Sequence, residues 1–204
     1  MTTVAADPAT RDGILAAAHA VFMRRGTSGA RMQEIAREAG VNKALLHYYF
    51  GTKQALADAV FRTAASNLLP TVFEVVGSTL PLEEKIELIV ARYIGFLRAR
   101  PYLPGYLISE LHADPERAAL LLPRPSGAAL AALQEQLDAG ARDGALRPIR
   151  AEHFLINMVS MIIFPFLVRP MLDVIFGIGG DRFDAYLTER QQALPIFIRN
   201  GLRP

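Results

Sequence analysis

The side chains whose types are best suited to binding or catalysis lie together in one short stretch. Residues 40–53 read GVNKALLHYYFGTK, with Lys43, His47, two adjacent tyrosines and Lys53. Ammonium groups bind phosphates, phenol rings pack on flat apolar surfaces, and an imidazole can donate, accept or move a proton. The stretch therefore fits a catalytic cluster, a core with polar tips, or a surface that contacts another molecule.

Catalysis is the weakest of these three interpretations. The chain has no cysteine, and it shows no nucleophile-elbow motif, glycine-rich phosphate loop or close pair of carboxylates. His112 and His153 are isolated in the sequence, so no metal site is predicted. We therefore predict that the protein is not an enzyme, that it has no catalytic residues, and that it needs no cofactor or metal.

The elements that must position this stretch are helices, because helical periodicity runs through nearly the whole chain. A first helix is predicted from about Thr10 to Arg25, and a short second helix ends at Gly40. Asn42 is a favoured N-cap residue for a third helix, which stops at Gly51. Two short helices separated by Gly-Val-Asn predict a helix-turn-helix over residues 31–50.

Helical geometry divides the third helix into an inner and an outer side. With Lys43 at zero and about 100° per residue, Leu46 falls at about 300° and Phe50 at about 340°, toward the first two helices. On the same count His47 lies at about 40°, Ala44 at about 100° and Tyr48 at about 140°, away from the core. Tyr49, at about 240°, is expected to pack its ring at the core rim and to extend its hydroxyl to a phosphate.

The outer side suits the major groove of DNA. A small alanine allows close approach, a tyrosine ring can touch a thymine methyl group, and lysine and histidine offer donors to base edges or phosphates. Thr52 begins a fourth helix, whose free amides beside Lys53 favour a phosphate. The charge agrees: residues up to Thr63 include eight basic and five acidic side chains, whereas the remainder has 14 and 15.

The segment Arg31–Lys53, RMQEIAREAGVNKALLHYYFGTK, resembles the DNA-binding segment of the tetracycline-repressor (TetR) family. That family's pattern has an Ile-Ala pair, an Ala-Gly-Val turn, Ser or Asn, a small residue, Leu, aromatic residues, Phe, and Ser/Thr-Lys. The first helix is also similar, down to Phe22 and Arg25-Gly26. The resemblance covers about the first 65 residues, and the helical remainder is compatible with it.

The resemblance implies a homodimer in which each N-terminal unit binds one half-site of a palindromic operator on double-stranded DNA. It also implies that the C-terminal helices form the dimer interface and a pocket for a small-molecule effector, whose binding releases DNA. The implied DNA-binding residues, including the two caps, are Arg31, Asn42, Lys43, Ala44, Leu45, His47, Tyr48, Tyr49, Thr52 and Lys53.

Two positions depart from the family pattern. The family usually has Thr or Ser at the two positions before Met32, as cap and phosphate donor, but this chain has Ala30 and Arg31. Arg31 is expected to reach a phosphate by its charge, without capping the helix. His47 stands where the family commonly has Tyr, which makes that contact chemically different.

The C-terminal part predicts further helices, with Pro and Gly between them. Phe154 to Val168 is strongly apolar, but polar residues and prolines interrupt the segment, so we expect a helix packed among others, kinked at Pro165, rather than a membrane span. At helical spacing most aromatic and Met residues here belong to a core. The candidates for a pocket lining are Tyr93, Phe96, Tyr102, Tyr106, Phe154, Asn157, Met158 and Met161.

The predicted fold class is all-α, with a three-helix helix-turn-helix DNA-binding domain over residues 8–68 and a helical ligand-binding and dimerisation domain over residues 69–204. The absence of cysteine and of an export signal at the start favours a cytoplasmic protein. The leading hypothesis is a ligand-released repressor. Two alternatives remain: a hydrophobic-ligand binding protein whose DNA-binding unit is unused, and a regulator without a ligand.

Overall fold

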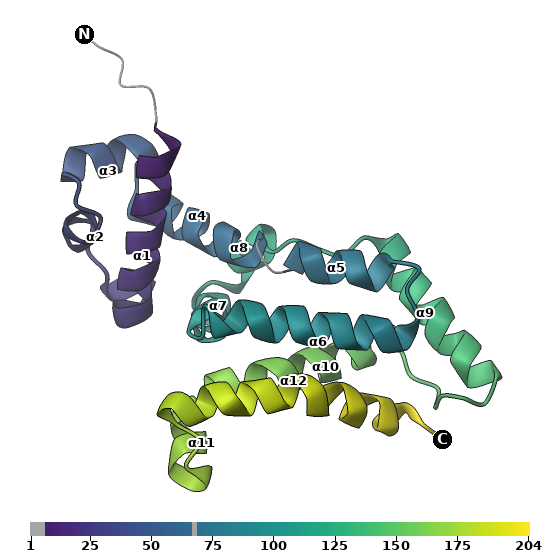
Figure 1. The fold of residues 1–204 in the computed structure, drawn as a ribbon. Helices are drawn as coiled ribbons and strands as arrows, with labels where there is room; N and C mark the ends of the chain where they lie inside the picture. Colours follow the sequence, from purple (N-terminus) through teal and green to yellow (C-terminus); the bar gives the residue numbers. More distant parts are fainter. Residues whose placement is uncertain (1–6, 67–68) are drawn as a thin grey trace. The chain divides into compact units, whose positions relative to one another are not determined.

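The computed structural model describes residues 7–66 and 69–204, and within these ranges it contains twelve α-helices and no strand (Figure 1). The predicted domain boundary at residue 68 lies outside the described residues. The helices are α1 (Pro8–Gly29), α2 (Met32–Glu38), α3 (Lys43–Phe50), α4 (Lys53–Ser66), α5 (Leu69–Gly77), α6 (Leu82–Arg98), α7 (Leu103–Ala113), α8 (Pro115–Leu121), α9 (Gly127–Arg142), α10 (Ala151–Leu167), α11 (Arg169–Phe176) and α12 (Gly180–Leu202).

The chain forms two compact units that are not contiguous in sequence. Unit 1 comprises residues 1–66 and 105–122, and unit 2 comprises residues 67–104 and 123–204. Unit 1 therefore contains α1–α4 together with α8 and most of α7. Helical periodicity could not indicate this return of the chain, because the partners that join residues 105–122 to unit 1, Thr27 and Asp58, are 83 and 59 residues away in sequence.

Unit 1 is built on α1, which packs against both α2 and α4. The carboxylate of Asp7 caps the first turn of α1 by accepting from the backbone N–H groups of Ala9 and Thr10. The hydroxyl of Thr10 and these two amides lower the pKa of Asp7. Gly26 has φ 68°, so the regular helix breaks there, one residue beyond its predicted end at Arg25.

A chain of polar side chains ties the returning segment of unit 1 to α1 and α4. The Glu110 carboxylate, only 4% exposed, accepts from the Thr27 hydroxyl at 2.6 Å and from the Arg117 guanidinium at 2.6 Å. Arg117 also donates to Asp58 of α4. Burial opposes the charge of Arg117, but hydrogen bonds to Glu110 and Asp58 outweigh this and raise its pKa.

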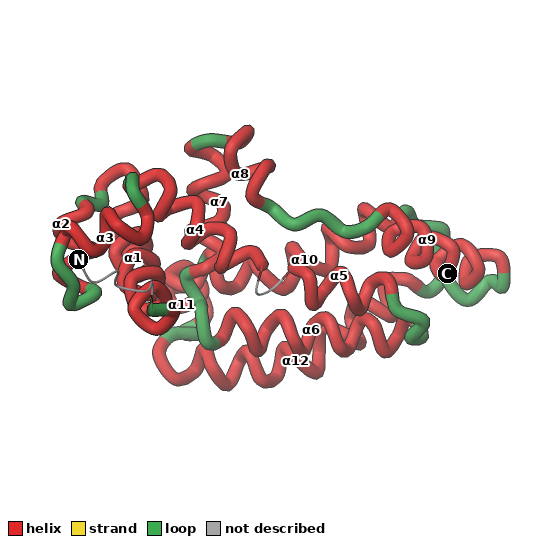
Figure 2. The backbone as a smooth tube through the Cα atoms, turned by 90° about the horizontal axis from the view of Figure 1, so that it is seen from above, coloured by secondary structure: helices red, strands yellow, loops and turns green. Residues whose placement is uncertain are grey.

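Unit 2 is a set of packed helices in which α12 lies along α6, α10 contacts α6 and α9, and α5 packs on α9 (Figures 1 and 2). The crossing of α5 and α9 is very close, since a Cβ atom on Gly77 would lie 2.9 Å from the Cβ of Ala129. Lys85 is buried and donates to the carbonyl of Val76 at 2.9 Å, at the end of α5. Burial lowers the pKa of Lys85.

The expected kink at Pro165 is wrong in position, because α10 continues through Pro165 and ends at Leu167. The break falls at Val168 (φ −107°, ψ 19°), two residues before Pro170. Proline is tolerated in the first turn of a helix, so α11 begins here as a new helix. No single helix within the described residues is long and apolar enough to cross a membrane; α10 and α11 together would meet that length and composition, but they are bent by 73°.

Candidate nucleic-acid interface

The turn between α2 and α3 has the geometry that the sequence predicted. Gly40 adopts φ 65°, the left-handed conformation that favours glycine. The Asn42 side chain accepts from the backbone N–H of Leu45 at 2.7 Å, which caps α3. Gly51, with φ 68°, ends α3, and the Thr52 hydroxyl accepts from the N–H of Ala55 at 3.1 Å to cap α4.

The orientation of α3 also agrees with the helical count. Leu46 and Phe50 are buried, and Leu45 and Tyr49 are half-buried. The side chains at the four predicted outer positions are exposed, including the Tyr48 ring at 61%. These positions, which we call the α3 face, are Lys43, Ala44, His47 and Tyr48.

The aromatic residues of α3 are packed against one another rather than loosely displayed. The rings of Tyr48 and Tyr49 meet edge to face, with centroids 5.5 Å apart. The Arg11 guanidinium lies over the Phe50 ring, 5.4 Å from its centroid. The exposed ring of Tyr48 therefore has a ring contact on its own helix.

Tyr49 and Lys53, which sequence reasoning assigned to phosphates, make contacts inside unit 1. The Tyr49 hydroxyl accepts from the backbone N–H of Asp7 at 2.8 Å and lies 3.3 Å from its carbonyl oxygen. The Lys53 ammonium donates to the carbonyls of Ser28 and Ala30, at 3.0 and 3.2 Å. Both side chains thus hold the ends of α1, and no periodic signal in the sequence could have indicated these partners.

Arg31 occupies the N-cap position of α2 without a side-chain cap hydrogen bond. The structure therefore lacks this side-chain cap, as the residues Ala30 and Arg31 led us to expect. Arg31 is exposed, whereas Ala30 is buried. The neighbouring charges are paired, since Arg24 forms a salt bridge with Glu38 at 2.9 Å between α1 and α2.

His47 has a specific intramolecular partner. Its Nδ1 lies 2.5 Å from the carbonyl oxygen of Gly51, while the Gly51 N–H donates to the His47 carbonyl at 2.8 Å. These two bonds join the last turn of α3 to its terminating glycine. The ring is therefore held in one orientation on the α3 face.

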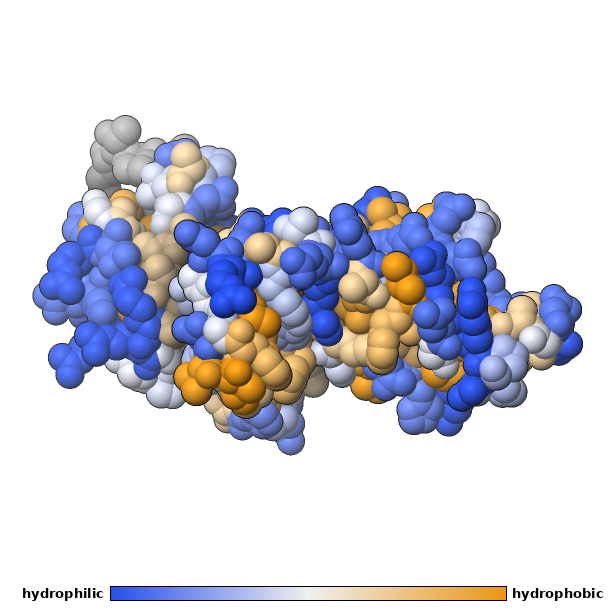
Figure 3. All heavy atoms as spheres, turned by 60° about the horizontal axis from the view of Figure 1, so that its bottom comes forward, coloured by the Kyte–Doolittle hydropathy of each residue, from blue (hydrophilic) through white to orange (hydrophobic). Residues whose placement is uncertain are grey.

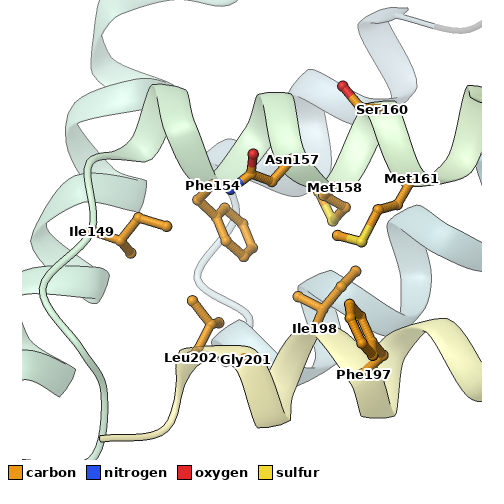
Figure 4. Close-up of a pocket in the computed structure, with 10 residues that line it drawn as sticks. All are labelled: Ile149, Phe154, Asn157, Met158, Ser160, Met161, Phe197, Ile198, Gly201 and Leu202. Carbon is orange, nitrogen blue, oxygen red and sulfur yellow. The ribbon is translucent and has the colours of Figure 1, made fainter.

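In unit 2 a groove of 370 Å³ opens between α10 and α12 (Figure 4). Four of the predicted pocket residues line it: Phe154, Asn157, Met158 and Met161. No signal in the sequence indicated the other lining residues, of which one precedes α10, one is on α10 and four are on α12. These are Ile149, Ser160, Phe197, Ile198, Gly201 and Leu202.

The other four predicted pocket residues lie elsewhere. Tyr93 is buried in unit 2, where burial raises the pKa of its hydroxyl to about 12. Phe96 is half-buried beneath the Arg100 guanidinium, and Tyr102 is 65% exposed. Tyr106 belongs to unit 1, where its ring packs edge-on against His19 and burial raises the pKa of its hydroxyl.

Large apolar side chains are exposed on α10 and α12, and one of them, Phe197, also lines the groove. Figure 3 shows apolar residues gathered in two areas on this side of unit 2. We call the exposed residues Ile156 and Phe164 of α10 with Ile196 and Phe197 of α12 the apolar face. A second group lies on α11 and consists of Met171, Val174, Ile175 and Phe176.

Comparison with known proteins agrees with this geometry. Residues 14–60, which span most of α1 through the middle of α4, match the family described as bacterial regulatory proteins, tetR family. The chain is 28% identical over 199 residues to the HTH-type transcriptional regulator RutR of Escherichia coli K12, covering 96% of this chain and 92% of RutR. Residues 14–60 therefore contain the N-terminal domain of the TetR family.

Two further comparisons give the extent of the likeness. The chain is 32% identical over 90 residues to the HTH-type transcriptional regulator BetI of Rhizobium meliloti, and this match spans 44% of each chain. The crystal structure of HlyIIR, a hemolysin II transcriptional regulator, superposes with a TM-score of 0.61 at 23% identity, covering 96% of this chain and 98% of HlyIIR. The TetR family consists of DNA-binding transcriptional regulators, not enzymes, and this general function is also that of the chain.

Proposed function

We propose that this regulator is a homodimeric repressor of the TetR family that binds a palindromic operator and is released by a small hydrophobic ligand. The observation that carries the DNA-binding part is the α3 face, which turns donors, one small residue and one aromatic ring outward from a helix whose other side is buried. This combination matches the edges of base pairs in a major groove. The proposed DNA-binding domain is residues 8–68, and the operator implies a cytoplasmic location.

The apolar face supports a second copy as the partner of unit 2. Phe164 and Phe197 are 54% and 66% exposed, although aromatic rings contribute most of their free energy when buried. In a two-fold dimer the same patch on each copy covers the other. We therefore propose that residues 69–204 supply dimerisation through α10 and α12, so that two α3 faces can bind the two halves of a palindrome.

The groove between α10 and α12 supports a ligand of mainly apolar character. Its volume of 370 Å³ falls within the range of small-molecule sites, and Asn157 supplies a polar group in a predominantly apolar lining. Release of DNA then follows from linkage: a ligand that binds the DNA-incompetent arrangement more tightly lowers DNA affinity by the same factor. The sign of regulation proposed here, repression, is the usual one in the family.

A binding experiment with purified protein tests the DNA-binding part. We expect a palindromic sequence selected from random DNA to bind one dimer, with affinity that falls steeply as salt rises. Tyr48→Ala should change which sequences are preferred, because the ring is offered to a base edge. Binding of all sequences with equal affinity, by both the unmodified protein and Tyr48→Ala, would contradict the proposal.

The ligand part needs a separate measurement. Filling the groove with Ser160→Phe, which removes space without removing a charge, should leave operator affinity intact while abolishing release by any effector found in a compound screen. An effector that still releases Ser160→Phe from the operator would show that the ligand site lies elsewhere.

A further inference from the structure

The hydrogen bond between His47 and Gly51 determines which ring nitrogen carries the proton. The distance from Nδ1 to the Gly51 carbonyl oxygen is 2.5 Å. A carbonyl oxygen can only accept, so Nδ1 must be the donor. In a neutral imidazole the second nitrogen then has no hydrogen. Nε2 of His47 is therefore an acceptor.

Nε2 of His47 is available to accept a hydrogen bond from another molecule. Within residues 7–66 and 69–204, Nε2 of His47 has no hydrogen-bond partner, and the side chain is exposed. The other neutral tautomer would place an unprotonated Nδ1, an acceptor, against the Gly51 carbonyl oxygen, and a ring rotated by 180° would place the Cδ2 carbon there, so both lose this hydrogen bond. The positive φ of Gly51 fixes the direction of that carbonyl.

We propose that His47 reads an exocyclic amino group, either N6 of adenine or N4 of cytosine, in the major groove. This inference rests on the proposed DNA-binding function. The major-groove edges of thymine and guanine offer no hydrogen-bond donor, only O4 or the pair O6 and N7. Phosphate oxygens are also acceptors, so the neutral ring has no hydrogen bond to offer them.

The neighbouring lysine has the opposite requirement. The ammonium group of Lys43 only donates, so it suits guanine or a phosphate oxygen. Lys43 and His47 lie one helical turn apart on the α3 face. The α3 face thus pairs one donor with one acceptor, and a half-site must supply an acceptor and an amino group in matching positions.

Chemically modified operators test this assignment. A preferred operator is first selected with the full chain at about pH 8.5, above the range in which imidazoles take up a proton. Each adenine of one half-site is then replaced by purine, and each cytosine by 2-pyrimidinone, which removes only the amino group. At one position we expect affinity to fall by about tenfold, the size of a modest mismatch.

Two variants connect that loss to His47. His47→Asn retains an amide N–H for the Gly51 carbonyl but has no atom at the place of Nε2, so removal of the amino group should no longer change its affinity. His47→Gln places an amide oxygen near Nε2 and should remain sensitive. Substitution of 7-deazaguanine, which removes an N7 acceptor, should affect both variants and the unmodified protein equally.

The outcomes separate this proposal from the general function. Operator binding with no amino-group position coupled to His47, or coupling to 7-deazaguanine or to a neutral methylphosphonate, would overturn the assignment and leave the regulator function standing. Failure to enrich any sequence from random DNA would overturn both.

Discussion

The α3 face and the apolar face differ in what they leave in contact with water. The α3 face shows Lys43, His47 and the hydroxyl-bearing ring of Tyr48, all of which keep polar atoms hydrated. The apolar face shows Phe164 and Phe197, with no charged tip. Exposed apolar area costs about 25 cal/mol per Å² relative to its burial. The polar atoms of the α3 face are hydrated in water, whereas burial of the apolar face would lower the free energy.

This difference separates two kinds of recognition. A charged, hydrated partner such as DNA exchanges water and counterions with the α3 face, so its affinity depends on salt. A second copy removes apolar area from water, and that contribution is not weakened by salt in the same way.

Placing a charge in the apolar face should have the largest effect. Phe197→Glu buries a carboxylate if the dimer forms, which we expect to weaken dimerisation by several kcal/mol, or more than 100-fold. Sedimentation should then detect monomer, and operator affinity should fall with it.

Gln192→Glu is the matched control for this charge. Gln192 is exposed on the same helix, about 140° around the axis from Phe197. It should leave the dimer unchanged. A dimeric Phe197→Glu would mean that the copies meet elsewhere.

The α3 face depends on unit 1 being folded. Substitutions in the ion pairs of Arg117 with Glu110 and Asp58 test how much these pairs stabilise that unit. Arg117→Met leaves Glu110 buried without its cation, and we expect unfolding free energy to fall by about 3 kcal/mol. Arg142→Met breaks an exposed pair with Glu135, which water and salt screen, and should leave the unfolding free energy almost unchanged. Equal denaturant midpoints for the two variants would show that the buried chain contributes no more than a surface pair.

Lys53 distinguishes support of the α3 face from direct contact with DNA. Lys53→Ala removes both bonds to the carbonyls of Ser28 and Ala30, so stability should fall by about 1–2 kcal/mol. We expect affinity for all DNA sequences to fall similarly. The slope of log affinity against log salt separates the roles, since loss of a phosphate contact reduces it by about one. An unchanged affinity and slope would exclude the phosphate contact, and Lys53→Arg controls for the charge.

The cap of α3 should give the smallest effect. Asn42→Ala removes the acceptor for the Leu45 N–H and should cost about 1 kcal/mol of stability. Asn42→Ser retains a capping oxygen and should lie close to the unmodified protein. Thermal unfolding of the three proteins would be compared, and the order Asn ≈ Ser > Ala is expected. A Ser variant as unstable as Ala would mean that the cap oxygen is not what matters.

Local rules predicted the α3 region well because its determinants are local. A glycine at the turn, an asparagine cap and a count of about 100° per residue set the orientation of α3, and Leu46 and Tyr48 lie where that count puts them. The partners of Tyr49 and Lys53 could not be predicted this way, since they are 42 residues and at least 23 residues distant in sequence. Four of the eight predicted pocket residues do not line the groove between α10 and α12. Periodicity identifies the apolar side of a helix, but it does not identify which other helix packs on that side.

The return of the chain into unit 1 has a consequence for evolution and engineering. Residues 105–122 supply Glu110 and Arg117, which contact Thr27 of α1 and Asp58 of α4, so α1–α4 alone lack part of the packing of unit 1. A chimera that joins residues 1–66 to the C-terminal part of another regulator would leave Thr27 and Asp58 without their partners Glu110 and Arg117. Recombination that preserves the contacts of unit 1 must therefore exchange two separate gene segments together.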